Sequence, residues 1–204
     1  AARIDSRLCR APVPARLVGL RSLRPSISRA HAGCHVRPVR FIRALIRGLI
    51  PLQRSVIRVP MRRVRPAVTR ANFGPVIVIH RNSHRLYLYR GVRLVRALTV
   101  STGRRSSPTP LGRFRIVTKA RRPWWYPPAS AWANRAQPIP PGPGNPLGTR
   151  WMGISAPEVG IHGTPDAASV GYSRSHGCVR MYRREAEWLF RRVRIGTPVI
   201  VVPV

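Results

Sequence analysis

The sequence predicts a mainly β fold, a sandwich or barrel, in the second part of the chain. From Gly74 onward, short β-branched or alternating apolar runs recur between turn-rich segments. One convincing helix follows late, at residues 184–193. Many short strands with a single late helix are typical of an all-β architecture. We therefore expect two regions, an N-terminal extension at 1–72 and a folded domain at 73–204.

Each strand is expected where apolar residues alternate or form a β-branched run. Arg90-Gly91 is a turn signal, and the runs on its two sides predict a hairpin. In the helix, Ala186, Leu189 and Phe190 share one face, which suits packing on a core. The expected strands are residues 75–79, 86–89, 92–100, 113–118, 151–155, 159–162 and 198–202.

Residues 121–149 form a long segment rich in Pro, Gly and Trp. It is too interrupted for a regular element, and a loop of this length inside a compact domain is usually functional or disordered. Its aromatic residues argue against disorder, so we expect an ordered lid or wall beside a site. The alternative is a surface loop whose Trp side chains fill gaps in the core.

The charge of the chain is extreme. Its 204 residues include 38 basic and 5 acidic side chains, a formal net charge of +33, and Lys119 is the only lysine. Such a surface attracts polyanions, so anionic wall polymers, anionic lipid and nucleic acid are all conceivable partners. The arginines form no recognised binding motif, and the alternative is a plain composition bias. We expect no specific nucleic-acid partner.

The extension at 1–72 is rich in Arg, Pro and Ser with little periodicity, and it is expected to be largely disordered. Its exception is residues 41–50, where apolar residues recur at helical spacing. A basic amphipathic helix here would suit an anionic membrane surface, while the alternative is a short packing helix or no stable structure. The apolar stretch is too short and too charged to span a membrane. No clear signal peptide is recognisable in the sequence given.

Three cysteines make an odd count, so at least one thiol is free or pairs between chains, and a disulfide scaffold is not expected. His31, Cys34 and His35 lie close enough in sequence to bind a metal. They lack a fourth ligand, however, and a metal site is not expected.

Cys178 is the candidate nucleophile. A thiol with an ordinary pKa near 8.5 is mostly protonated at neutral pH and needs a positioned base. Two histidines lie within sixteen residues of it: His176 is beside it on the same segment, whereas His162 ends another expected strand. Spacing alone leaves both open, along with the possibility that Cys178 is simply a buried structural residue.

The environment of these residues suits acyl transfer. The amides at Gly177 and Cys178 could stabilise an oxyanion. Asp166 is left out of the catalytic set, and we expect a backbone carbonyl, such as that of Gly163, to orient the imidazole of His162. A metal site is the competing interpretation, but no C-x-x-C partner or carboxylate stands at ligand spacing.

At these positions the chain resembles the L,D-transpeptidase (YkuD) family. The signature stands as IHGTPDAASVGYSRSHGCVRM, where a His precedes [ST]-[HK]-G-C. The resemblance extends over residues 74–204, through VIVIHRNSHRLYLYRG, STGRRSSPTPLGRFRI, PPGPGNPLGTRWMGIS and GTPVIVV. The chain departs from the family pattern in its few acids, including the Asp usually found near Arg81.

The resemblance implies a β-sandwich enzyme of peptidoglycan synthesis. The thiolate would attack the L-centre carbonyl of a tetrapeptide stem, release D-Ala and pass the acyl group to an amine in a 3-3 cross-link. Water as acceptor would make the protein an L,D-carboxypeptidase, and a non-catalytic polyanion-binding protein is the remaining alternative. The resemblance also implies acylation by carbapenems, no cofactor, no metal, an extracytoplasmic location and a monomer.

The resemblance assigns a role to each site residue. The catalytic pair is Cys178 and His162; the oxyanion region and its support are His176, Gly177, Ser175 and Gly163; and the substrate-binding residues are Arg180, Trp151 and Tyr172.

Overall fold

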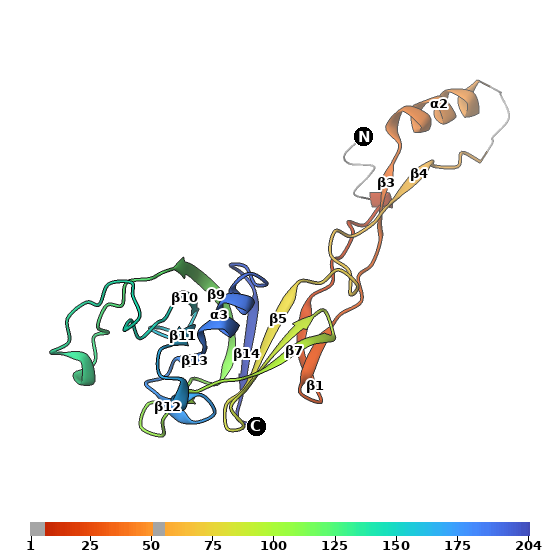
Figure 1. The fold of residues 1–204 in the computed structure, drawn as a ribbon. Coiled ribbons are helices and arrows are strands. Elements are labelled where there is room, and N and C mark those ends of the chain that lie inside the picture. Colours follow the sequence, from red (N-terminus) through yellow and green to blue (C-terminus); the bar gives the residue numbers. More distant parts are fainter. Residues whose placement is uncertain (1–6, 51–55) are drawn as a thin grey trace. The chain divides into compact units, whose positions relative to one another are not determined.

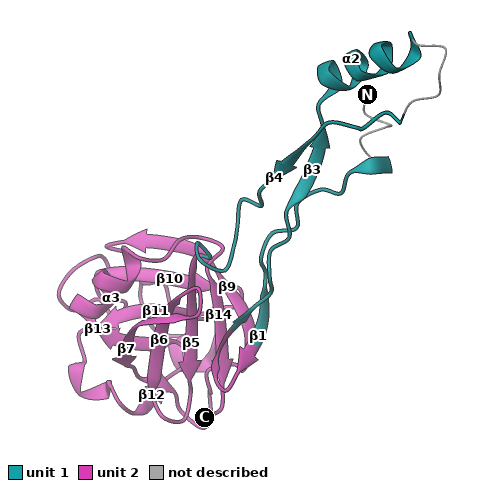
Figure 2. Ribbon diagram, turned by 90° about the vertical axis from the view of Figure 1, so that its right-hand side faces the viewer, with its two compact units in different colours: residues 1–19, 26–73 teal, residues 20–25, 74–204 magenta. Residues whose placement is uncertain are grey.

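The computed structural model describes residues 7–50 and 56–204. The chain divides into two compact units, residues 1–19 with 26–73 and residues 20–25 with 74–204 (Figure 2). The second unit therefore begins close to the expected position at 73 but also includes residues 20–25, the turn of the first hairpin. We describe the two units separately.

The second unit is built on one eight-stranded sheet in the order β13-β11-β10-β9-β14-β5-β6-β7 (Figure 1). A short additional pair, β8 and β12, lies outside this sheet. The mainly β prediction is confirmed. The strands are β5 (Pro75–His80), β6 (Arg85–Arg90), β7 (Arg93–Thr99), β8 (Thr102–Gly103), β9 (Gly112–Arg121), β10 (Arg150–Ile154), β11 (Gly160–Thr164), β12 (Ser173–Ser175), β13 (Val179–Tyr182) and β14 (Pro198–Val202).

A single core joins both halves of this sheet. Helix α3 (Arg183–Phe190) packs on β10, β11 and β13. Its Ala186 and Leu189 are fully buried in the same cluster as Ile77 of β5 and Met152 of β10. Strand alternation explains the arrangement, because every second side chain points to the same face. The two halves thus enclose one apolar interior, as in a sandwich.

Lys119 of β9 closes the end of α3. Its Nζ donates hydrogen bonds to the carbonyl oxygens of Phe190 at 2.8 Å and Val193 at 2.6 Å. It also lies 4.0 Å from the centroid of the Phe190 ring. Carbonyls at a helix C-terminus lack partners within the helix and attract cations. The only lysine of the chain therefore ties the late helix to the sheet.

Before residue 74, the structure contains strands and a helix where the sequence predicts a largely disordered segment. Strands β1 (Leu17–Arg21) and β2 (Arg24–Ile27) form a hairpin, and β3 (Gly33–Val36) pairs antiparallel with β4 (Met61–Val64). Val13, which precedes β1, and His31, which precedes β3, exchange backbone hydrogen bonds of 2.8 and 2.9 Å. These contacts join segments far apart in sequence, so local composition does not reveal them.

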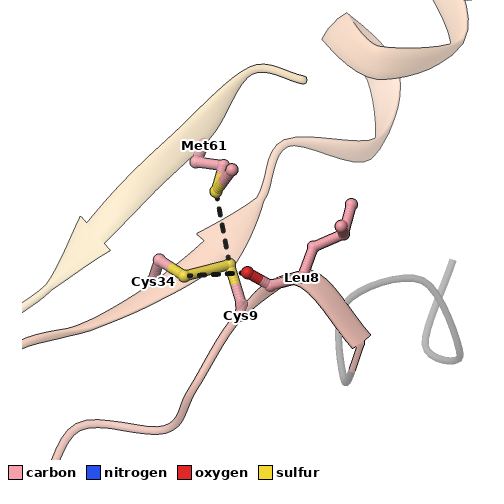
Figure 3. The surroundings of a disulfide bond; sticks show 4 residues. All are labelled: Leu8, Cys9, Cys34 and Met61. Carbon is pink, nitrogen blue, oxygen red and sulfur yellow. Dashed lines mark hydrogen bonds between the residues drawn. A yellow bond between two sulfur atoms is a disulfide. The ribbon is translucent and has the colours of Figure 1, made fainter. Parts of the chain in front are cut away.

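A disulfide between Cys9 and Cys34 links the start of this unit to β3 (Figure 3). The two Cα atoms are 5.1 Å apart, and Met61 Sδ of β4 lies 3.7 Å from Cys9 Sγ. The bridge takes Cys34 away from the conceivable metal trio with His31 and His35. Among the described residues, Cys178 is the free thiol that the odd cysteine count requires.

Helix α2 (Pro38–Leu49) follows β3 directly and covers most of the amphipathic segment expected at 41–50. It begins earlier than expected because Pro38 occupies the first turn, where its missing N–H costs nothing and its fixed φ suits the helix. Within the described ranges, no helix is long and apolar enough to cross a membrane.

Candidate active site

His162 lies on β11, and Cys178 directly precedes β13, the strand that pairs parallel with β11. Strands β11 and β13 pair with Ile161 opposite Val179 and His162 opposite Arg180. Ile161 and Val179 both belong to the core. Because side chains alternate along a strand, His162 and Arg180 point away from that core. The predicted thiol and the predicted base thus come from neighbouring segments of the sheet, with Cys178 one residue before β13.

His162 is 3% exposed, and its Nδ1 lies 2.7 Å from the carbonyl oxygen of Gly163. A carbonyl can only accept, so Nδ1 carries the proton and Nε2 is left as the free base. Burial lowers the pKa of His162 from 6.5 to about 4; the hydrogen bond to Gly163 opposes this shift, and the charge of Arg180 adds to it. The imidazole is therefore neutral at neutral pH. The contact with Gly163 is the one expected from the sequence.

The Cys178 thiol is partly buried. Its Sγ lies 3.5 Å from the carbonyl oxygen of Glu158. Burial raises the pKa of Cys178, and the nearby Glu158 charge raises it further, while a hydrogen bond from the Gly160 backbone and the Arg180 charge lower it. Burial is the largest of these effects, so the resting protein holds a thiol and not a thiolate.

The turn before Cys178 is fixed by Ser175, which is completely buried. Its hydroxyl donates to the carbonyl oxygen of Cys178 and accepts from the Gly177 N–H at 3.2 Å. Gly177 has φ +110°, a conformation that side-chain-bearing residues rarely adopt. Because the Gly177 N–H is engaged with Ser175, it holds the turn in the resting structure.

Trp151 of β10 lies beside His162. It pairs with His162 across β10 and β11, and the two rings lie 5.8 Å apart between centroids. The indole N–H donates to Thr118 Oγ1 at 3.3 Å. A Cβ on Gly160 would collide with the indole ring, so the glycine is what admits Trp151. The ring forms a wall beside His162.

The long loop at 121–149 reaches this face, as expected for a lid or wall. Trp132, in the short helix η1 (Ala131–Ala133), stacks on the His176 ring with centroids 3.9 Å apart and planes 13° from parallel. The Ala129 N–H donates to Glu158 Oε1 at 3.3 Å. Since Trp132 remains 46% exposed, it does not fill the core. His176 thus contacts the loop, whereas His162 lies in the sheet.

Asn145 holds the loop together from inside. It is completely buried, and its amide group donates to the carbonyl oxygens of Pro123, Ile139 and Pro140 at 3.0 to 3.1 Å. Its Oδ1 accepts from the Leu147 N–H at 2.8 Å. One side chain therefore satisfies four backbone groups of a segment with few backbone ladders of its own.

The remaining predicted residues occupy different positions. Arg180 is half-buried on β13, and its backbone exchanges hydrogen bonds with Ser101 at 2.7 and 2.9 Å. Tyr172 is mostly exposed, and Arg174 lies over its ring at 5.4 Å. The charge of Arg180 therefore acts on both Cys178 and His162. Tyr172 contacts Arg174 through its ring, and its carbonyl oxygen accepts hydrogen bonds from the Ser101 hydroxyl and the Thr102 N–H.

Sequence reasoning missed three residues of this site: Trp132, Glu158 and Asn145. A signal existed for Glu158, since it is one of only five acids in the chain. Trp132 lies inside the loop whose aromatic residues were noted, but nothing in its spacing singled it out. Asn145 acts through a folded loop and has no local pattern.

A free thiol directly before β13 and a neutral, buried imidazole on the paired strand β11 are residue types that suit cysteine-dependent acyl transfer. The sequence model of the L,D-transpeptidase catalytic domain (YkuD) matches residues 74–201. The chain belongs to this family.

Relatives support the assignment. YqjB of Bacillus subtilis, a candidate L,D-transpeptidase, is 32% identical over 133 residues, which are 62% of this chain and 70% of that protein. YbiS of Escherichia coli K12, also a candidate L,D-transpeptidase, is 31% identical over 159 residues, which are 74% of this chain and 50% of that protein. The chain therefore spans only about half the length of some curated relatives.

Solved structures share the fold. An L,D-transpeptidase from Mycobacterium smegmatis matches with a TM-score of 0.55 at 16% identity, covering 84% of this chain and 91% of that one. L,D-transpeptidase 3 from Mycobacterium tuberculosis matches with a TM-score of 0.54 at 18% identity, covering 86% and 93%. A further L,D-transpeptidase with a TM-score of 0.54 at 20% identity, covering 85% and 92%, was solved in complex with imipenem.

Proposed function

We propose that this chain is a peptidoglycan L,D-transpeptidase that forms 3-3 cross-links through a thioester on Cys178. The observation that supports the proposal is the parallel pairing of β11 and β13: Cys178 directly precedes β13, and the buried His162 of β11 has its Nδ1 bonded to the Gly163 carbonyl. Family membership supports the reaction class. The substrate, the mechanism and the acceptor are parts of the proposal.

In the first half-reaction, His162 Nε2 takes the thiol proton as Cys178 Sγ attacks the L-centre carbonyl of the donor tetrapeptide stem. A C–S bond forms, and the carbonyl electron pair becomes an oxyanion. We assign its stabilisation to the Cys178 N–H within the turn that Ser175 and Gly177 hold, with the His176 ring beside it. The bond to D-Ala then breaks, and His162 returns the proton to the leaving amine.

In the second half-reaction, an amine of a neighbouring stem attacks the thioester. His162 takes a proton from that amine, and the Cys178 thiol is restored. Water in place of the amine would give an L,D-carboxypeptidase with the same residues. We favour the amine because the chain belongs to a transpeptidase family.

Three side chains are assigned to substrate binding. Arg180 provides a positive charge beside the pair and suits a substrate carboxylate, while Trp151 forms a wall near His162. Tyr172 is exposed enough to contact a substrate outside the sheet face. The substrate belongs to the cell wall, so we also propose an extracytoplasmic location.

Imipenem provides the first test, because an L,D-transpeptidase of the same fold was solved in complex with it. Intact-mass spectrometry should show one adduct, mapped to Cys178 and absent from Cys178→Ala. Replacing the base, His162→Gln, should slow acylation by about a hundredfold or more. The matched variant His176→Gln should slow it by less than about tenfold, since His176 is not assigned as the base.

Incubation with purified disaccharide-tetrapeptide identifies the acceptor. A 3-3 cross-linked dimer supports the transpeptidase, and a tripeptide without a dimer supports the carboxypeptidase. If the folded protein gives neither product nor an imipenem adduct, the catalytic proposal is wrong and a basic polyanion-binding protein remains.

A further inference from the structure

Helix α2 presents a continuous apolar stripe to solvent. Val39, Ile42, Ile46 and Leu49 recur at intervals of three and four residues, so they lie on one side of the helix. Their side chains are 61%, 54%, 54% and 74% exposed, and α2 contains no buried residue. Four large aliphatic side chains in water along a single helix are unfavourable unless another surface covers them.

Positive charge borders this stripe. Arg40, Arg43 and Arg47 also recur at intervals of three and four residues and occupy the neighbouring side of α2, and all three are exposed. The sequence has no acidic residue from Arg10 to Pro157, so neither the helix nor its flanking segments carry a compensating charge. A surface that covers the stripe must therefore also accommodate a row of positively charged guanidinium groups, and an anionic surface would neutralise them.

The rest of the helix faces its own unit. Phe41 and Leu45 are half-buried and line the same cavity as Val36 of β3 and Val64 of β4. The Cys9–Cys34 disulfide lines that cavity too. Val39 and Ile42 of the stripe also line this cavity, whereas Ile46 and Leu49 do not. The stripe thus begins at the rim of the cavity and continues along the exposed side of the helix.

We propose that α2 lies in the interface of an anionic lipid bilayer. The stripe of Val39, Ile42, Ile46 and Leu49 would enter the boundary between headgroups and acyl chains, and the arginines would bind lipid phosphates. A short helix with one apolar face and a cationic polar face is the arrangement that binds bilayers in the plane of the interface. Guanidinium groups also match phosphate oxygens in geometry.

The apolar stripe favours a bilayer over a soluble polyanion. A wall polymer or a nucleic acid would neutralise the arginines but leave the four aliphatic side chains in water. An anionic bilayer would remove the apolar stripe from water and would also neutralise the arginines. Burying one isoleucine increases partitioning by on the order of tenfold, and each arginine near an anionic surface adds about fivefold.

The test is cosedimentation of the full-length Cys178→Ala chain with vesicles of phosphatidylglycerol and phosphatidylcholine, compared with pure phosphatidylcholine. Ile42→Gln/Ile46→Gln removes half of the stripe without changing the charge or lowering helix propensity, and should weaken binding to the anionic vesicles by about tenfold or more. The control Leu111→Gln/Ile195→Gln removes two exposed apolar side chains from the second unit and should bind like the parent. Circular dichroism verifies that each variant is folded.

A second pair of variants separates local from total charge. Arg43→Gln/Arg47→Gln and Arg105→Gln/Arg184→Gln lose the same charge, but only the first should weaken vesicle binding by about tenfold or more. Equal losses in both would mean non-specific attraction and would overturn the proposal. Unchanged binding of Ile42→Gln/Ile46→Gln would overturn it as well, in favour of a soluble polyanion. Because vesicle binding needs no catalysis, neither result depends on the proposed enzyme activity.

Discussion

At the residue level, the candidate catalytic pair is electrically neutral at rest. The pKa of Cys178 is raised by burial, and that of His162 is lowered by burial to about 4. Proton transfer between them is therefore unfavourable before a substrate arrives. This arrangement differs from a preformed thiolate–imidazolium pair, and under the proposed function His162 would act as a general base during attack.

The neutral pair predicts the pH dependence of alkylation. The rate of iodoacetamide reaction at Cys178 should rise with pH, with a midpoint above that of Cys178 in the urea-unfolded chain, because burial disfavours the thiolate. Arg180→Gln should move the midpoint further upward, since the arginine charge lowers the pKa of this thiol. Peptide mapping by mass spectrometry measures the rate at this one site. Rapid alkylation that persists well below the pKa of an ordinary thiol would contradict the neutral pair.

At the level of elements, the loop at 121–149 depends on one buried amide. The Asn145 amide donates to the carbonyl oxygens of Pro123, Ile139 and Pro140 within the loop. The antiparallel bridge between Trp125 and Ile139 closes the same segment. The position of Trp132 over His176 is thus set at some distance from the candidate catalytic pair.

Replacing Asn145 should loosen this loop without unfolding the sheet. For Asn145→Ala we expect faster amide hydrogen exchange across 121–149, because a lost hydrogen bond at a buried group costs about 1–3 kcal/mol. Exchange in β5 and β14 should stay unchanged. In the control Asn134→Ala, which replaces an exposed asparagine of the same loop, exchange across 121–149 should stay unchanged as well. Equal protection of the loop in both variants would show that Asn145 does not hold it.

The elements also show what sequence can and cannot reveal. Strands such as β5 and β14 are continuous β-branched runs buried on both sides, and their boundaries were predicted within one residue. Strand β13 was missed because it has four residues and alternates Arg180 with apolar neighbours. Strands β3 and β4 were missed because each is short and polar, and their stability comes from pairing with a segment almost thirty residues away.

The residues of the candidate site also differ in whether the sequence could indicate them. Cys178 and His162 could be proposed from the sequence because catalytic chemistry restricts residue type. The hydrogen bond between His162 and the Gly163 carbonyl was expected and is present. The stacking of Trp132 on His176 depends on how the long loop folds, and no local pattern encodes that.

For the whole molecule, the buried His162 couples stability to pH. The unfolded chain binds a proton on this residue below about 6.5, but the folded chain does not until the pH approaches 4. The unfolded state therefore binds more protons between these values, so stability falls as the pH falls through this window. A shift from 6.5 to about 4 corresponds to about 3 kcal/mol in the free energy of unfolding.

Urea unfolding at a series of pH values should show this loss. His162→Gln removes the titrating group, so its stability should fall less between pH 6.5 and 4 than that of the parent. Some loss should remain, because burial also lowers the pKa of His80. If parent and variant lost stability in parallel, His162 would not be the group responsible.

The lone lysine has a consequence for the chemistry of the whole surface. An enzyme that holds an activated acyl group and delivers it to amines risks labelling itself wherever it carries free side-chain amines. Guanidinium groups remain protonated at any physiological pH and are poor nucleophiles, so an arginine surface supplies positive charge without competing acceptors. The one ε-amine, on Lys119, is held by two carbonyl oxygens at the end of α3. Under the proposed reaction, almost no side chain of this protein would compete with the substrate amine for its own thioester.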